Sequence, residues 1–156
     1  MTLPPPQRQM EAFVRVMVIV KATKESEAEN TPLEMEGAAE MFAAMEKHNE
    51  ELVEAGIMLS GDGLKPSKFG KRIHFKGAKR SVTDGPFAET KELVAGYWVW
   101  QVRSMEEAVE WAKRCPNPMP GPSDLEIRPF WEPEDFDPEI VAQVNAHREK
   151  IATEEK

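Results

Sequence analysis

The loop at residues 83–92 carries the side chain best suited to acid or base chemistry. Asp84 lies at the end of a predicted strand, in the run Thr83-Asp84-Gly85-Pro86-Phe87. A carboxylate held in an otherwise apolar loop can have a raised pKa and can move a proton. An Asp before Gly-Pro also commonly accepts hydrogen bonds from backbone N–H groups and so holds a turn. The catalytic and the turn-forming interpretations of Asp84 both stay open.

A second group of candidates lies on the predicted long helix. Asn49 falls between Met45 and Leu52 in the apolar stripe, so its amide should face the sheet. A buried amide needs a partner, which is either a loop backbone or a ligand in a cleft between helix and sheet. The neighbouring His48 stands at the edge of the stripe. A surface position is the default expectation for His48, with lining of the cleft as the alternative.

The other candidate ligand-binding residues belong to predicted strands and to the Asp84 loop. Alternation along residues 93–102 sends Trp98 to one face and Tyr97 to the other, and a tyrosine hydroxyl needs a polar neighbour even when the ring is buried. Arg128, on the last strand, is suited to an anionic ligand group, although pairing with a local carboxylate is the alternative. We also assign Phe87 to the ligand-binding group.

Charge and hydropathy exclude two classes of partner. Lys and Arg number 20 against 28 Asp and Glu, and the formal net charge of −8 opposes binding to nucleic acid. The longest apolar run, residues 13–20, is interrupted by Arg15 and falls far short of the roughly 20 residues of a membrane span. We therefore expect neither nucleic acid nor a membrane as a partner.

Cysteine and histidine usage predicts no metal site. The single Cys115 and the scattered His48, His74 and His147 lack the grouped spacing of zinc ligands. One cysteine that can form no internal disulfide fits the reducing cytoplasm. Neither a phosphate-binding glycine loop nor a dinucleotide fingerprint occurs, so we expect no cofactor.

Hydrophobic periodicity and capping residues define the elements that must position these side chains. We predict a helix at residues 32–55, starting at Thr31-Pro32 and ending at Gly56, and a second that begins after Ser104 and ends at Pro116. Gly61-Asp62-Gly63 should break the strand before it. Strands are predicted at 12–21, 57–60, 72–75, 79–83, 93–102 and 125–130.

This order predicts an α+β fold, a ferredoxin-like split βαβ unit with a β-hairpin insertion. The domain should span residues 12–131, after a tail at 1–11 and before an acidic extension at 132–156 that is partly helical. Strands 12–21 and 93–102 are apolar on both faces, whereas two helices cover only one face of a sheet. A second copy of the chain is the simplest cover for the other face, so we expect a homodimer.

The run from Thr83 to Glu92, which includes Asp84-Gly85-Pro86-Phe87, resembles the signature of the DGPF branch of the YCII-related proteins. Shorter segments resemble the same family in the same order: Asn49-Glu50-Glu51-Leu52, Gly61-Asp62-Gly63-Leu64, Ala95-Gly96-Tyr97-Trp98 and Glu110-Trp111-Ala112. The resemblance covers residues 12–131 and implies a dimeric α+β barrel.

The resemblance implies little about activity. Most members are uncharacterised, and some are encoded beside sigma factors of the extracytoplasmic-function type. Smaller relatives are proposed to be enzymes with a His and Asp pair. Here Lys21-Ala22-Thr23-Lys24 follows the first strand without a histidine, so that pair cannot be transferred to this chain.

Three functional hypotheses follow. The first is a small-molecule binding protein or accessory factor, with a pocket between helix 32–55 and the sheet and with Asp84, Asn49 and Tyr97 at its polar edge. The second is a cofactor-independent enzyme in which Asp84 moves a proton. The third is a protein-interaction module, linked to transcription regulation, that uses the acidic extension as its contact surface.

Overall fold

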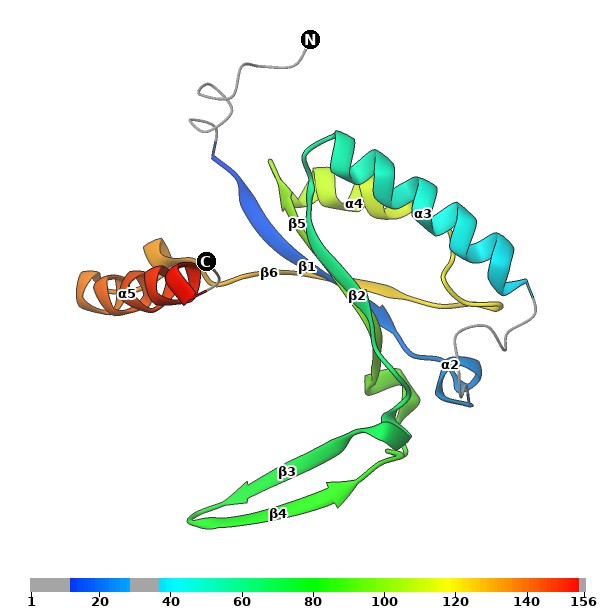
Figure 1. Ribbon diagram of the computed structural model, residues 1–156, viewed down its shortest axis with the longest axis horizontal. Helices are drawn as coiled ribbons and strands as arrows, with labels where there is room; N and C mark the ends of the chain where they lie inside the picture. Colours follow the sequence, from blue (N-terminus) through cyan, green and yellow to red (C-terminus); the bar gives the residue numbers. More distant parts are fainter. Residues whose placement is uncertain (1–11, 29–36, 155–156) are drawn as a thin grey trace.

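The fold is built on a four-stranded antiparallel sheet. The computed structural model describes residues 12–28 and 37–154. The strands β1 (Val14–Lys21) and β5 (Val94–Val102) are central, and β2 (Met58–Gly63) and β6 (Leu125–Pro129) lie at the edges, in the order β2-β5-β1-β6 (Figure 1). All three strand pairings in this sheet are antiparallel. This order, with α-helices after β1 and after β5, is the predicted ferredoxin-like α+β fold, which is confirmed.

The helices end and begin where the sequence carries capping signals. Helix α3 (Ala38–Glu54) is followed by Gly56 at a φ of 73°, in the left-handed region that favours glycine, as predicted. Its predicted start at Thr31-Pro32 lies outside the described residues. Helix α4 (Met105–Lys113) begins after Ser104, whose Oγ accepts a hydrogen bond from the Glu107 backbone N–H at 3.2 Å. A short helix, α2 (Lys24–Ala28), follows β1.

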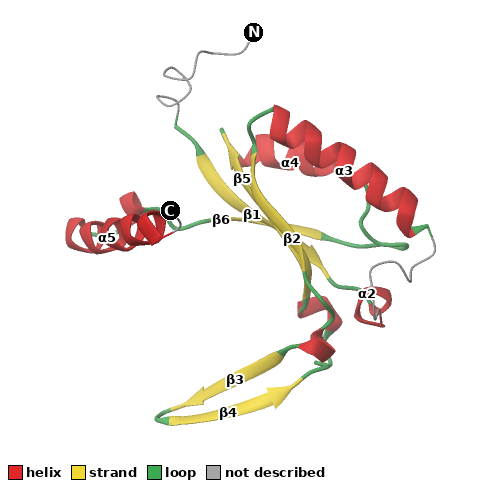
Figure 2. Ribbon diagram, in the orientation of Figure 1, coloured by secondary structure: helices red, strands yellow, loops and turns green. Residues whose placement is uncertain are grey.

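The hydrophobic core lies between one face of the sheet and the helices α3 and α4, which are on the same side of the sheet (Figures 1 and 2). Its members alternate along the central strands and are joined by residues of the two helices and of the loops. They are Val16, Val18, Val20, Leu52, Ile57, Trp98, Trp100, Val102, Ala108 and Met119. Trp100 and Leu52 are completely buried. Alternate burial along β1 and β5 therefore defines one core face.

The opposite face of the sheet is only half-buried within one chain. Met17 is registered with Val99, and Ile19 with Tyr97, and all four are of intermediate exposure. The expected cover for this face is a second copy of the chain, which stays a prediction. Apolar residues occur on both faces, but the chain's own long helices cover one of them.

Strand β2 continues through the glycines that were expected to break it. Gly61 is registered with Trp98 and Gly63 with Gly96. A Cβ on Gly61 would lie 2.7 Å from Trp98 Cδ1. Glycine at this position lets a large indole pack directly against the neighbouring strand, so the Gly-Asp-Gly run marks a close approach and not a turn.

The predicted hairpin is confirmed, with strands β3 (Lys71–Lys76) and β4 (Lys79–Asp84) joined at Gly77. It projects from the sheet as a separate two-stranded ribbon (Figure 1). Every residue of both strands is exposed, so both faces of the hairpin are solvated. We call residues 71–84 the arm.

The C-terminal part forms a 3-10 turn (Pro133–Asp135) and helix α5 (Pro138–Glu154), the segment in which a final helix was predicted. Glu132 attaches this part to the sheet, because its carboxylate accepts a hydrogen bond from Arg15 Nε at 2.7 Å. Helix α5 lies beside the 3-10 turn and away from α3 and α4 (Figure 2). The predicted tail, residues 1–11, lies outside the described residues.

Candidate functional site

A cavity of about 660 Å³ lies between α3, the β2 and β5 edge of the sheet, α2 and the loop that precedes β6. Its volume is in the range of small-molecule sites, roughly 300–1,000 Å³. The residues that line it are Val20, Ser26, Glu27, Met41, Phe42, Met45, Glu46, Asn49, Met58, Gly61, Asp62, Gly63, Leu64, Lys65, Pro66, Ala95, Gly96, Tyr97, Trp98, Pro118 and Met119. We call it the methionine cavity. It occupies the place, between helix and sheet, where a cleft was expected.

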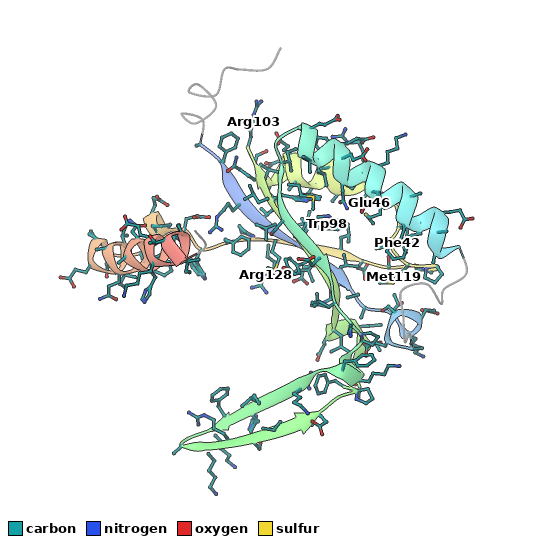
Figure 3. All side chains as sticks on the ribbon, viewed as in Figure 1. Phe42, Glu46, Trp98, Arg103, Met119 and Arg128 are labelled. Carbon is teal, nitrogen blue, oxygen red and sulfur yellow. The ribbon has the colours of Figure 1, made fainter. Side chains whose placement is uncertain are left out.

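The walls of the methionine cavity are soft and largely apolar. Four thioethers, those of Met41, Met45, Met58 and Met119, line it from α3, β2 and the loop before β6. Methionine side chains are flexible and polarizable, so such walls adapt to ligands of different shape and pack well against aromatic rings. Figure 3 shows Phe42 and Glu46 on α3 and Met119 on the loop below that helix.

Asn49 provides a fixed polar group in this wall. Its Oδ1 accepts a hydrogen bond from Trp98 Nε1 at 2.8 Å. The partner is thus an indole, and neither a loop backbone nor a ligand as the two alternatives held. Among residues 12–28 and 37–154, none accepts a hydrogen bond from the Asn49 amide nitrogen. Because Asn49 lines the cavity, its N–H groups can serve a ligand acceptor.

Carboxylates dominate the charge of the lining. Glu27, Glu46 and Asp62 contribute three acids, against the single cation of Lys65. The Glu27 carboxylate also accepts hydrogen bonds from the backbone N–H of Ser67, at 3.0 and 3.2 Å, and from its hydroxyl. The lining is therefore acidic, and one of its acids, Glu27, has a structural partner.

Tyr97 and His48 differ in how they relate to the cavity. Tyr97 is part of the lining, although strand alternation places its ring on the face opposite Trp98. His48 is not part of the lining and is not on the surface, so both expectations for it are wrong. It is 3% exposed, between Trp98 and Trp111 at ring distances of 6.5 and 6.4 Å.

Burial governs the ionisation of His48. Desolvation lowers the pKa of its imidazole below the usual 6.5, the positive charge of Arg114 lowers it further, and the charge of Glu51 opposes both. The buried Nε2 atom has no hydrogen-bond partner among the described residues. His48 is thus a neutral member of the aromatic core, and protonating it costs stability.

We expect this core histidine to make the fold acid-sensitive. The pKa of His48 in the folded chain lies below the unfolded value near 6.5, so the unfolded state binds the proton more tightly. The free energy of unfolding therefore falls as the pH decreases from above 6.5 towards the lower folded pKa. His48→Leu should reduce the loss of unfolding free energy between about pH 7.5 and about pH 5.5, because it removes the group that takes up a proton on unfolding. Urea denaturation at the two pH values measures this, with His74→Gln, at an exposed arm position, as the control. Equal acid sensitivity of His48→Leu and the parent chain would contradict it.

The structure does not bring Asp84, Phe87 and Arg128 to the cavity. Asp84 is at the base of the arm, where its carboxylate pairs with Lys71 Nζ and its side chain is 74% exposed. The Phe87 ring lies under the Arg72 guanidinium, 3.9 Å from its carbon. Arg128 is registered with Met17, on the sheet face opposite the helices, and lies apart from Phe42 and Met119 in Figure 3. The expectation that Asp84 forms the polar edge of the pocket is wrong.

The Asp84 loop contacts the segment that leads into the arm. The Phe87 backbone N–H donates to Ser67 Oγ at 3.0 Å, and the Gly85 N–H donates to the Gly70 carbonyl at 3.0 Å. A Cβ on Gly85 would lie 1.8 Å from the Ser67 carbonyl oxygen. The loop therefore fastens the base of the arm, through contacts that only glycine permits at residue 85.

Cys115, the single cysteine of the chain, is partly buried. Burial raises the pKa of the Cys115 thiol to about 11, and its Sγ donates to the Pro116 carbonyl at 3.3 Å, so little of the reactive thiolate forms at neutral pH. No three His, Cys, Asp or Glu side chains within residues 12–28 and 37–154 are grouped so that they could hold a metal ion. None of the helices in those ranges has the length and apolarity of a membrane span.

The lining methionines were not predicted from the sequence as site residues. Met45 was assigned to the apolar stripe of the helix, and such a stripe does not distinguish a residue that packs against the sheet from one that faces a cavity. The composition carried a signal for these residues, because nine methionines in 156 residues is a high number and methionine is common in adaptable binding surfaces.

The fold and its helix-to-sheet cavity define an α+β protein of the ferredoxin-like class. The YCII-related domain matches residues 14–131, and the chain belongs to that family. A curated relative from Rhizobium meliloti (strain 1021), "Uncharacterized protein R00369", is 34% identical over 78 residues. The aligned part covers 50% of this chain and 63% of that protein.

Proposed function

We propose that this YCII-related chain binds a small, largely apolar molecule in the methionine cavity. The observation that carries the proposal is a cavity of about 660 Å³ with apolar walls and one oriented amide, that of Asn49. Sites for small molecules combine these features, since apolar walls provide affinity and a few polar groups fix the orientation.

The lining also favours a class of ligand. The lining carboxylates attract cations and repel anions, and the methionine thioethers make favourable contacts with aromatic rings. The Asn49 N–H groups suit a carbonyl or ether oxygen. A neutral or cationic aromatic compound therefore fits the cavity better than a carboxylic acid of the same size.

Three naphthalene derivatives of matched size test this class. 1-Naphthylmethylammonium and 1-naphthylacetamide should raise the melting temperature, and 1-naphthylacetate should raise it least, because only the acetate opposes the charges of Glu46 and Asp62. The double variant Glu46→Gln/Asp62→Asn should weaken binding of the ammonium compound by about two- to tenfold and leave the amide unchanged. Thermal shift and isothermal titration calorimetry measure both effects.

A matched control is available on the same helix. Glu50 is exposed on α3 and is not part of the lining, so Glu50→Gln should leave all three compounds unaffected. Absence of any shift at millimolar concentration, or tightest binding of the acetate, would show that the cavity does not select this class.

Two further properties belong to the same proposal. The half-buried apolar face around Met17 and Val99 supports a homodimer in which a second copy covers it, and the single cysteine supports a cytoplasmic location. Proton transfer by Asp84 inside the cavity has no support, because that carboxylate is on the arm.

A further inference from the structure

The arm and the segment before it form a strongly basic surface on an acidic protein. Residues 63–84 carry seven Lys and Arg residues and one acid, Asp84, which pairs with Lys71, whereas the whole chain has a net charge of −8. Lys76 and Lys79 are paired directly across the two strands. Like charges at opposite positions destabilise a hairpin, and an anionic group bound beside this pair would relieve the repulsion.

The arm also has an exposed apolar face, on which the Arg80 guanidinium carbon lies 4.4 Å from the centre of the Phe75 ring. Ile73 and Val82 are registered with each other, and Phe75 follows on the same face. Their exposed fractions are 48%, 61% and 65%. An isolated two-stranded hairpin is marginally stable in water, and an exposed apolar patch beside charges is typical of a protein interface.

The base of the arm is fixed, which gives the arm a defined direction. Ser67 is held both by the Glu27 carboxylate and by the Phe87 N–H, and Gly85 donates to Gly70. These contacts tie the arm to α2 and to the loop before β5. A ribbon that is fixed at one end and exposed over its length can insert into a neighbouring molecule with little loss of conformational freedom.

The C-terminal segment of the chain has the complementary chemistry. Residues 132–149 carry six acids and one arginine. Phe136 and Ile140 are 39% and 43% exposed and provide apolar contacts beside the acids. Figure 1 shows α5 and the arm far apart in one chain, so the arm does not satisfy this segment of its own molecule.

We infer that the arm of one copy binds the acidic segment 132–149 of a second copy of this chain. The Ile73, Phe75 and Val82 face packs against the apolar residues of that segment, while the basic side chains pair with its carboxylates. In a two-fold symmetric dimer the contact forms twice, once for each arm. The occupant is a second copy because the same sequence carries both complementary surfaces.

Charge reversal with rescue tests the inference on the full chain. Lys76→Glu/Lys79→Glu on the arm, or Glu134→Lys/Glu139→Lys in the acidic segment, should each weaken self-association about tenfold or more at about 50 mM salt, because each leaves like charges facing one another. Combining the two reversals in one chain should restore affinity to within about threefold. Sedimentation velocity measures the dissociation constants.

The variants separate this inference from its alternatives. All four reversed residues are exposed, so circular dichroism should show unchanged folding. Binding of 1-naphthylacetamide in the methionine cavity should also be unchanged, even in variants whose arm no longer binds the second copy. Glu50→Lys/Glu54→Lys on exposed positions of α3 is the matched control and should not weaken association. Failure of the combined reversal to rescue association would overturn the inference. Arm-dependent binding of a duplex of about 20 base pairs, with association unaffected by either reversal, would overturn it in favour of nucleic acid.

Discussion

Replacing Trp100 with alanine should cost about 3–5 kcal/mol of unfolding free energy, the range measured for large aromatic residues removed from a core. Trp100 is completely buried on β5, and its ring lies 5.8 Å from that of Trp98. A domain of this kind has about 5–15 kcal/mol in total, so Trp100→Ala should lose about a fifth of its stability at the least and nearly all of it at the most. The loss is partly offset because the buried Nε1 has no hydrogen-bond partner among the described residues. Urea denaturation followed by circular dichroism measures the difference.

Trp131→Ala provides the matched control for the removal of an indole. Its side chain is 75% exposed and contacts Phe136 at a ring distance of 5.7 Å. The expected change is within about 0.5 kcal/mol, as for most exposed positions. Comparable losses in the two variants would mean that burial against α3 and α4 is not the main source of stability.

The second large effect is expected at Gly85. In Gly85→Ala the new methyl group would meet the Ser67 carbonyl at 1.8 Å, which the backbone cannot accommodate without moving. The base of the arm should therefore separate from the loop, at a cost of about 1–3 kcal/mol, as in overpacked sites. Hydrogen–deuterium exchange should show lost protection of the Gly85 amide, which donates to Gly70, and faster exchange along β3 and β4.

Gly63→Ala is the control, since a Cβ at Gly63 would meet no atom within 4 Å. It should leave both the melting temperature and the exchange of the arm nearly unchanged. If Gly85→Ala instead kept a protected arm and lost only ligand binding, the loop would be part of a binding site and not a fastening. The placement of Asp84 beside Lys71 favours the fastening interpretation.

Much of the fold could be predicted because its signals are local. Ser104 marks the start of α4, Gly56 follows the end of α3, and Gly77 turns the hairpin. Gly61-Asp62-Gly63 was misread because a glycine that admits a neighbouring indole has the same sequence signature as one that turns the chain. The partner of Gly61 is Trp98, far away along the chain, and no local pattern reveals it.

The site was predictable only in part, for the same reason. Asn49 was expected to face the sheet, and it does line the cavity. His48 stands three residues after Met45 and four before Leu52, so it shares the helix face that packs on the sheet, and helical spacing alone could have placed it in the core. Asp84 could not be placed, because the direction of the arm depends on distant contacts with Ser67.

Ser67 lies in a segment that connects the methionine cavity with the base of the arm. The adjoining residues Lys65 and Pro66 belong to the lining of the methionine cavity, while Ser67 itself fastens the arm. One short segment is thus shared between an internal binding event and an external one. If a ligand in the cavity shifts that segment, it changes the affinity of the arm for its binding partner. Thermodynamic reciprocity then requires that binding of the arm to its partner change the affinity of the cavity for the ligand by the same factor.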